Sequence, residues 1–159
     1  MRQVKMTRES FHVFQAAAKN ALKQSEQVPS VLICAGTGCV SSGALLIHAR
    51  LVELLEQRGI PCAVELEDDH KDGSVRVTKG GCPGFCEGWL YTRVKVADVD
   101  EIVEKTVLKG ELVERLAYHD ESGKLYAKKE EIPFYQKQTR VVLENCGHVD
   151  ADSILEYLS

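Results

Sequence analysis

Four cysteines, arranged as two pairs, are the feature that most constrains the fold of this chain. The first pair lies in Cys34-Ala-Gly-Thr-Gly-Cys39 and the second in Cys82-Pro-Gly-Phe-Cys86. Each pair sits in a glycine-rich segment that follows an apolar, strand-like run. Two separate turns of chain can therefore bring four thiols to one point, and we expect all four cysteines to bind metal.

Four thiolates suit either zinc or an iron–sulfur cluster. Structural zinc sites usually leave two to four residues between paired ligands, and the two spacings here lie at the loose edge of that range. A two-iron cluster needs wider, glycine-rich loops whose backbone N–H groups can approach its sulfurs. Seven of the twelve glycines lie around the cysteines: Gly36, Gly38, Gly43, Gly80, Gly81, Gly84 and Gly88. We therefore expect an anionic [2Fe-2S] cluster, with cofactor contacts from Gly36, Gly38 and Gly84.

Hydrophobic periodicity predicts helices and strands around these loops. The expected helices cover residues 7–24, 43–58 and 98–109. The expected strands cover residues 31–33, 62–67 and 74–79, with room for one more within 87–96. This order predicts an α/β fold, a small mixed sheet with flanking helices, preceded by an N-terminal helix and followed by a C-terminal extension.

Two of these expectations concern the sheet directly. The run at 31–33 is wholly apolar, which favours a central strand that ends at the first cysteine. Segments 62–67 and 74–79 flank a polar turn and are expected as a hairpin, or as a strand with a loop. In the second segment, Val75 and Val77 are expected in the core, with Arg76 and Lys79 facing water.

The helix expected at 43–58 begins directly after the first cysteine pair. Ser41 or Ser42 is expected to cap it, and Gly59 to end it. Its N-terminal N–H groups and partial positive charge would then point toward the first cysteine loop, where they favour a bound anion.

The two cysteine runs resemble those of thioredoxin-like [2Fe-2S] ferredoxins. The later runs Val96-Ala-Asp-Val-Asp-Glu-Ile-Val103 and Gly110-Glu-Leu-Val-Glu-Arg-Leu116 add to the resemblance. More closely, the chain is similar to the N-terminal region of the NADH-linked flavoprotein subunit of multimeric, bifurcating iron hydrogenases and NAD-dependent formate dehydrogenases. This resemblance implies a thioredoxin-like fold and one-electron transfer through the cluster. It also implies partners, namely other subunits of an NADH-linked oxidoreductase.

The resemblance further implies three parts: an N-terminal helix (1–30), a thioredoxin-like [2Fe-2S] domain (31–117), and a linker with the start of a flavoprotein domain (118–159). The phosphate-cradling glycine motif of that flavoprotein domain is not found in this sequence. FMN and NAD are therefore expected only in a downstream domain, and the chain is not expected to be catalytic on its own. The family has an additional strand after its second cysteine pair. Either the sheet of this chain is one strand shorter, or residues are missing between Glu87 and Gly88, and we expect the second.

Composition excludes some classes of function. A net charge of -4 argues against a nucleic-acid binder. No apolar run approaches the roughly 20 residues that span a bilayer, and a signal-peptide pattern is not seen, so we expect a cytoplasmic protein. A homodimer is compatible with the sequence. The remaining cysteines, Cys62 and Cys146, are expected as small buried or half-buried hydrophobes, and the histidines at positions 48, 70, 119 and 148 as solvated side chains.

Two alternatives remain open at this point. One is a structural zinc module that binds a partner without redox work. The other is a thioredoxin-like dithiol protein, whose usual sequence sign is Cys-x-x-Cys near a strand–helix turn, a motif that this sequence lacks.

Overall fold

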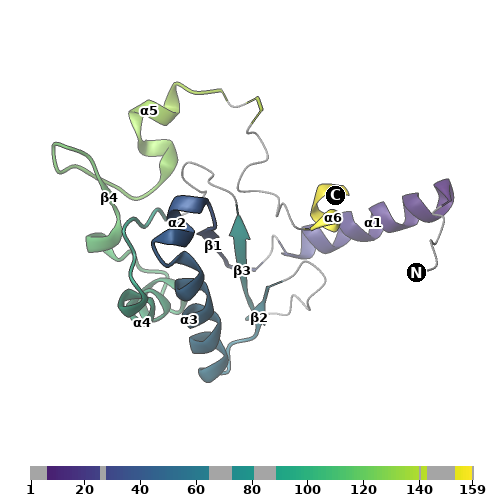
Figure 1. Cartoon of the computed structure of the whole chain (residues 1–159), viewed down its shortest axis with the longest axis horizontal. Coiled ribbons are helices and arrows are strands. Elements are labelled where there is room, and N and C mark those ends of the chain that lie inside the picture. The colour runs from purple at the N-terminus through teal and green to yellow at the C-terminus, as the bar shows by residue number, and fades with distance from the viewer. Residues whose placement is uncertain are drawn as a thin grey trace.

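A three-stranded parallel sheet organises the computed structural model of the chain (Figure 1). The structure describes residues 7–25, 28–64, 73–80, 89–139, 141–142 and 153–158. The strands are β1 (Ser30–Cys34), β2 (Cys62–Ala63) and β3 (Val75–Gly80), in the order β1-β3-β2. Among the described strands β3 is therefore central and β1 lies at an edge, so the expected central position of 31–33 is wrong. The burial explains why: Val75, Val77 and Gly80 of β3 are buried, whereas β1 is only half-buried.

The expected hairpin is also wrong, because β2 and β3 run parallel. Cys62 lies opposite Val75 and Ala63 opposite Arg76. A hairpin would reverse the chain, but the segment between the two strands is close to the dozen or so residues that a parallel crossover needs. The predicted inward and outward positions on β3 are confirmed for three residues: Val75 and Val77 are buried, and Lys79 is exposed. Arg76, which was expected to face water, is half-buried.

One face of the sheet is covered by α3 (Ala44–Gln57), as the periodicity predicted. Leu51, Leu54 and Leu55 of α3 pack into the main core, and full burial of one such side chain stabilises the fold by roughly 1.5–3 kcal/mol. The helix ends at Gly59, whose φ of 67° is left-handed. The N–H groups of Gly59 and Ile60 bond back into the last turn, which completes a Schellman cap.

The predicted helix at 98–109 is a succession of three helical types. It comprises the 3-10 turn η1 (Val96–Asp98), α4 (Val99–Glu101) and the π-helical η2 (Ile102–Val107). The N–H of Leu108 bonds to the carbonyl of Val103, five residues back, which is the wider π-type spacing. The segment still buries the predicted face, since Val99, Ile102 and Val103 are all at most 8 % exposed.

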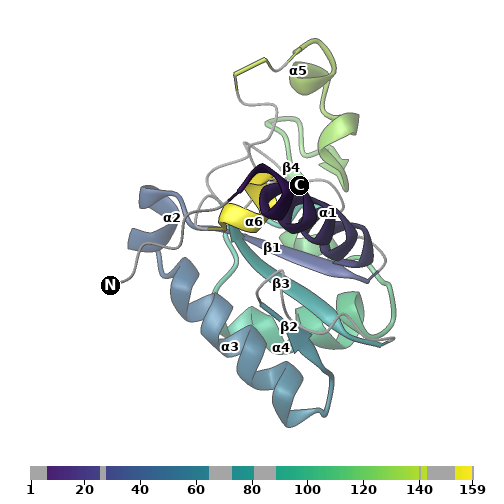
Figure 2. The ribbon, with the colours of Figure 1, turned by 90° about the vertical axis from the view of Figure 1, so that its right-hand side faces the viewer.

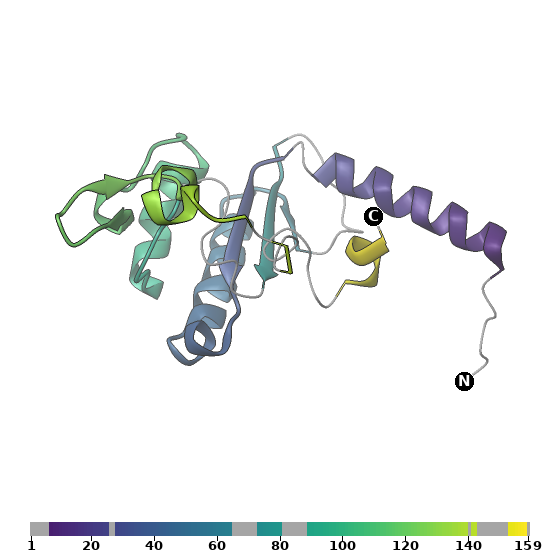
Figure 3. The ribbon, with the colours of Figure 1, turned by 90° about the horizontal axis from the view of Figure 1, so that it is seen from above.

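The N-terminal helix predicted at 7–24 is α1 (Arg8–Ser25). The N–H of Ser10 donates to the side-chain oxygen of Thr7 over 3.2 Å and so caps its first turn. Helix α1 packs against α6 (Ile154–Leu158). Figures 2 and 3 show these two helices together, on the other side of the sheet from α3. No helix in the part of the chain that the structure describes is long and apolar enough to cross a membrane.

Residues 89–139 end in a small antiparallel unit that the sequence analysis did not predict. Its strands are β4 (Tyr118–His119) and β5 (Leu125–Tyr126), which are joined by residues 120–124. Short helices accompany it: η3 (Glu114–Leu116), η4 (Lys129–Glu131) and α5 (Pro133–Gln136). The strand expected within 87–96 is reduced, in the described residues, to one bridge between Tyr91 and Ala117. The chain is thus a small α/β fold with parallel and antiparallel strands, as expected, although the two kinds of pairing lie in separate sheets.

Candidate metal centre

The first cysteine pair begins where β1 ends. Cys34 is the last residue of β1, and in the parallel register it lies opposite Gly80, the last residue of β3. The N–H of Ala35 donates to the carbonyl oxygen of Gly80 over 2.7 Å, so the two strands stay paired up to their carboxyl ends. The segments that carry the two cysteine pairs therefore begin at the same end of the sheet, at the carboxyl ends of two neighbouring strands.

Cys39 lies on a short helix, α2 (Thr37–Ser41), that precedes α3. Its side chain is exposed, and its thiol is free. The side chain of Cys34 is half-buried. The first pair therefore combines one thiol at the surface with one at the sheet edge.

The expected capping of α3 by Ser41 or Ser42 is wrong. Both hydroxyls donate over 2.9 Å to carbonyl oxygens one turn back, at Thr37 and Gly38. Such local back-bonding competes with capping. Gly43 is the N-cap instead, and its φ of 93° is a left-handed conformation that glycine adopts without strain. Helix α2, which carries Cys39, thus lies between Cys34 and the start of α3 along the chain. The expected stabilisation of an anion by the α3 dipole stays a prediction.

The first cysteine loop contains two glycines: backbone conformation does not require glycine at Gly36, and neither conformation nor close packing requires it at Gly38. Gly36 caps α2 with a φ of -62°, which any residue can adopt. A Cβ added to Gly38 would meet no described atom within 4 Å. Glycine inside a helix costs about 0.5–1 kcal/mol relative to alanine. Neither packing nor conformation therefore accounts for Gly38, which leaves open its predicted contact with a cofactor.

Cys62 lies at the opposite end of the sheet. It pairs with Val75, the first residue of β3, whereas Cys34 pairs with Gly80, the last. Five residues of strand separate these two levels, which is about 16 Å. Cys62 also packs against the main core, which confirms the expectation of a half-buried hydrophobe.

His48, expected as a solvated side chain, is half-buried on α3. Its Nε2 is shielded from water and has no hydrogen-bond partner among the described residues. Burial, assisted by the positive charge of Lys79, lowers the pKa of His48 below its ordinary value. His119 is exposed, as expected, and its Nδ1 lies 2.9 Å from the carbonyl oxygen of Ala117.

Several predicted residues lie outside the described part of the structure. These are Cys82, Cys86, Gly84, Cys146, His70, His148 and the join between Glu87 and Gly88. Within the residues that are described, no three His, Cys, Asp or Glu side chains gather into a group that could hold a metal ion. The four-cysteine site therefore stays a prediction. The structure describes its first cysteine pair, Cys34 and Cys39, and the end of β3 at Gly80 that precedes the second pair. No protein-family model matches the chain.

Proposed function

We propose that this chain transfers single electrons through a [2Fe-2S] cluster held by Cys34, Cys39, Cys82 and Cys86. The observation that supports this most is the register of β1 and β3. Cys34 lies opposite Gly80, so both cysteine-bearing segments start from adjacent strand ends.

The covalent chain limits how far apart the two pairs can begin. Two Cα-to-Cα steps along the chain separate Gly80 from Cys82, and two steps can span at most about 7 Å. Neighbouring strands are about 4.8 Å apart. The Cα atom of Cys82 is therefore within about 12 Å of that of Cys34, whatever path the chain takes, which is a short reach for ligands of one cluster.

The donor set and its surroundings fit such a group. Four thiolates are the usual ligands of a [2Fe-2S] cluster, which supplies one-electron redox chemistry when bound. The sequence from Ser30 to Ala49 contains no Asp, Glu, Lys or Arg, although 28 % of the chain is charged. On the side of the first cysteine pair, backbone N–H groups and burial would therefore affect the reduction potential more than side-chain charges within this segment.

The resemblance described above guides the choice of partners. We propose that the chain works with other subunits of an NADH-linked oxidoreductase of the hydrogenase or formate dehydrogenase type, in the cytoplasm. FMN and NAD would bind in a downstream domain of that flavoprotein subunit. The roles proposed for this chain's own residues are to hold the cluster and to shield it from solvent.

Metal analysis of protein purified without oxygen tests the proposal. We expect equal amounts of iron and acid-labile sulfide, and an EPR signal that appears on reduction by dithionite and accounts for one electron per chain. A colourless protein with stoichiometric zinc would instead support a structural zinc module. A colourless protein that holds no metal and whose thiols cycle with a disulfide would support a dithiol protein.

A further inference from the structure

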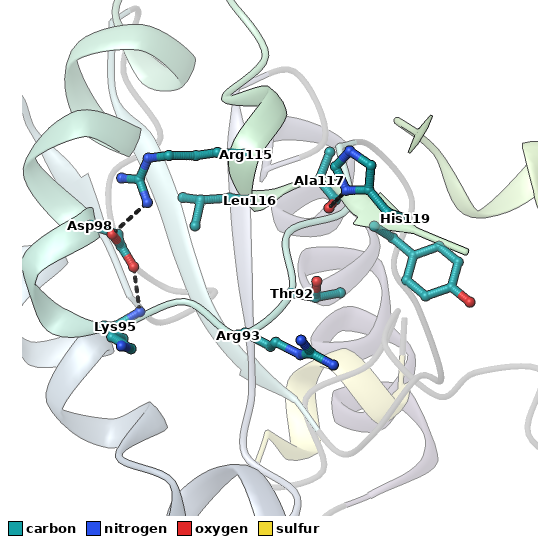
Figure 4. Close-up of a pocket in the computed structure, with 9 residues that line it drawn as sticks. Thr92, Arg93, Lys95, Asp98, Arg115, Leu116, Ala117 and His119 are labelled. Atoms are coloured by element: carbon teal, nitrogen blue, oxygen red, sulfur yellow. Dashed lines mark hydrogen bonds and ion pairs between the residues drawn. The ribbon is translucent and has the colours of Figure 1, made fainter. Parts of the chain in front are cut away.

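A hollow of about 510 Å³ opens between residues 92–95 and residues 115–119 (Figure 4). Its two walls are fixed to each other at both ends. At one end the N–H of Thr92 donates to the carbonyl oxygen of Leu116 over 2.8 Å. At the other end Arg115 donates to Asp98 over 2.9 Å. The hollow is of a size that holds a small molecule.

The positive charge of this hollow exceeds its negative charge. Asp98 is its one carboxylate, and Figure 4 shows it between Arg115 and Lys95, where it accepts the backbone N–H of Lys95 over 2.8 Å. Arg115 is also paired with Glu101. The side-chain charges of Arg93 and Lys95 form no ion pair with any described residue. Two cations that form no ion pair within the described residues therefore line a hollow on a chain whose net charge is -4.

The backbone of Arg93 is strained, because this residue adopts a left-handed conformation. Its φ is 57°, and it is the one residue other than glycine with a positive φ among those described. Glycine adopts this conformation freely, whereas a residue with a Cβ is strained. Strained residues persist mainly at functional sites. Since glycine would fit the backbone better, the feature that justifies arginine here is its side chain.

We propose that this hollow binds the phosphate group of a small molecule. The planar guanidinium of Arg93 can donate two hydrogen bonds to one phosphate, and the Lys95 ammonium adds a second positive charge to the lining of the hollow. The hydroxyl of Thr92, which also lines the hollow, offers a further donor. Neither Cys34 nor Cys39 lines this hollow, and the proposal does not depend on the proposed redox function.

Calorimetric titration of the full chain with pyrophosphate tests the proposal. We expect binding at millimolar or lower concentration that weakens as salt is added. Arg93→Gly should weaken it about tenfold or more, because a hydrogen bond to a charged group is lost. The same variant should keep or raise the melting temperature, because the backbone strain is relieved. Lys95→Gln should also weaken binding, whereas Lys109→Ala, which removes an exposed cation outside the hollow, should leave it unchanged.

Three outcomes would overturn the proposal. They are a wild-type chain that does not bind pyrophosphate at millimolar concentration, equal losses from Arg93→Gly and Lys109→Ala, and sulfate binding as tight as that of pyrophosphate. The last would identify a general anion site. Because Lys95→Gln leaves the backbone strain untouched, it tests the charge of the hollow even if Arg93→Gly alters the fold.

Discussion

A Cβ atom added to Gly80 would lie 2.9 Å from Cδ1 of Leu32 on the neighbouring strand. Real Cβ atoms essentially never come so close to another heavy atom. A side chain at position 80 would therefore force the Leu32 side chain to move, and the packing of β3 against β1 favours glycine here. This differs from the reason that the sequence suggested, which was the approach of backbone N–H groups to a cofactor.

We predict that Gly80→Ala destabilises the fold by about 1–3 kcal/mol, the usual cost of overpacking. Urea unfolding of both proteins would measure it. In a Leu32→Ala background, Gly80→Ala should cost less than it does in the wild type, since the methyl group that clashes is no longer there. Gly38→Ala is the matched control, because a Cβ there meets no described atom. Equal losses from the two glycine variants would contradict this account of Gly80.

The ligand set can be tested by single substitutions. We predict that serine at Cys34, Cys39, Cys82 or Cys86 removes or strongly perturbs the visible absorption and the EPR signal of the reduced protein, because iron loses a thiolate ligand. Cys62→Ser is the control, since Cys62 begins β2 about 16 Å of strand away from the level of Cys34. Loss of the spectrum in Cys62→Ser, with an intact spectrum in Cys34→Ser, would show that the ligands are assigned wrongly.

We predict that the free energy of unfolding depends on pH through the carboxylate of Asp98. The N–H of Lys95, and after it Arg115, hold the pKa of this carboxyl below its ordinary value, and its side chain is 14 % exposed. Because the folded state favours the charged form, the contribution is present at neutral pH and is lost as the pH falls below about 4. Asp98→Ala should cost about 1 kcal/mol of unfolding free energy at pH 7.

The difference between wild type and Asp98→Ala should shrink in acid. Urea unfolding at neutral pH and again near pH 3 would measure it, about one unit below the ordinary pKa of an aspartate. Glu56→Gln, at an exposed carboxyl of α3 with no ion pair in the described structure, should show neither effect. A constant difference across this range would mean that Asp98 acts through packing and not through its charge.

The sequence predicted those features that depend on local residue patterns, namely the periodicity of apolar residues and the residues that end a helix. The apolar face of α3 and its end at Gly59 follow from residue spacing and from the need for a left-handed glycine. Strand order does not follow from local pattern. The run of β1 is typical of a buried strand, but β1 lies at an edge of the sheet that the structure describes, because the order of strands depends on the whole sheet and not on one segment. The hairpin of β4 and β5 was missed because each strand has only two residues, too few for alternation to appear.

The candidate sites divide in the same way. A cysteine thiol can bind metal because of its own chemistry, so the pair Cys34 and Cys39 can be identified as candidate ligands from the sequence alone. The hollow beside Arg93 was missed because its walls come from segments about 20 residues apart and its strain is a property of the backbone. The nearest signal in the sequence was the alternation of cations at Arg93 and Lys95, which by itself is equally typical of a solvated strand face.

The last prediction is that NADH alone does not reduce this chain. Dinucleotides and flavins are held by glycine-rich backbone at a helix N-terminus. Two of the glycines beside the candidate ligands are already accounted for, Gly43 by its left-handed φ and Gly80 by its contact with Leu32. Dithionite should therefore give the one-electron [2Fe-2S] signal, while NADH without a partner subunit leaves the absorption spectrum unchanged. Stoichiometric flavin in the purified protein, or rapid bleaching by NADH, would place nucleotide chemistry within this chain and contradict the division of labour proposed for it.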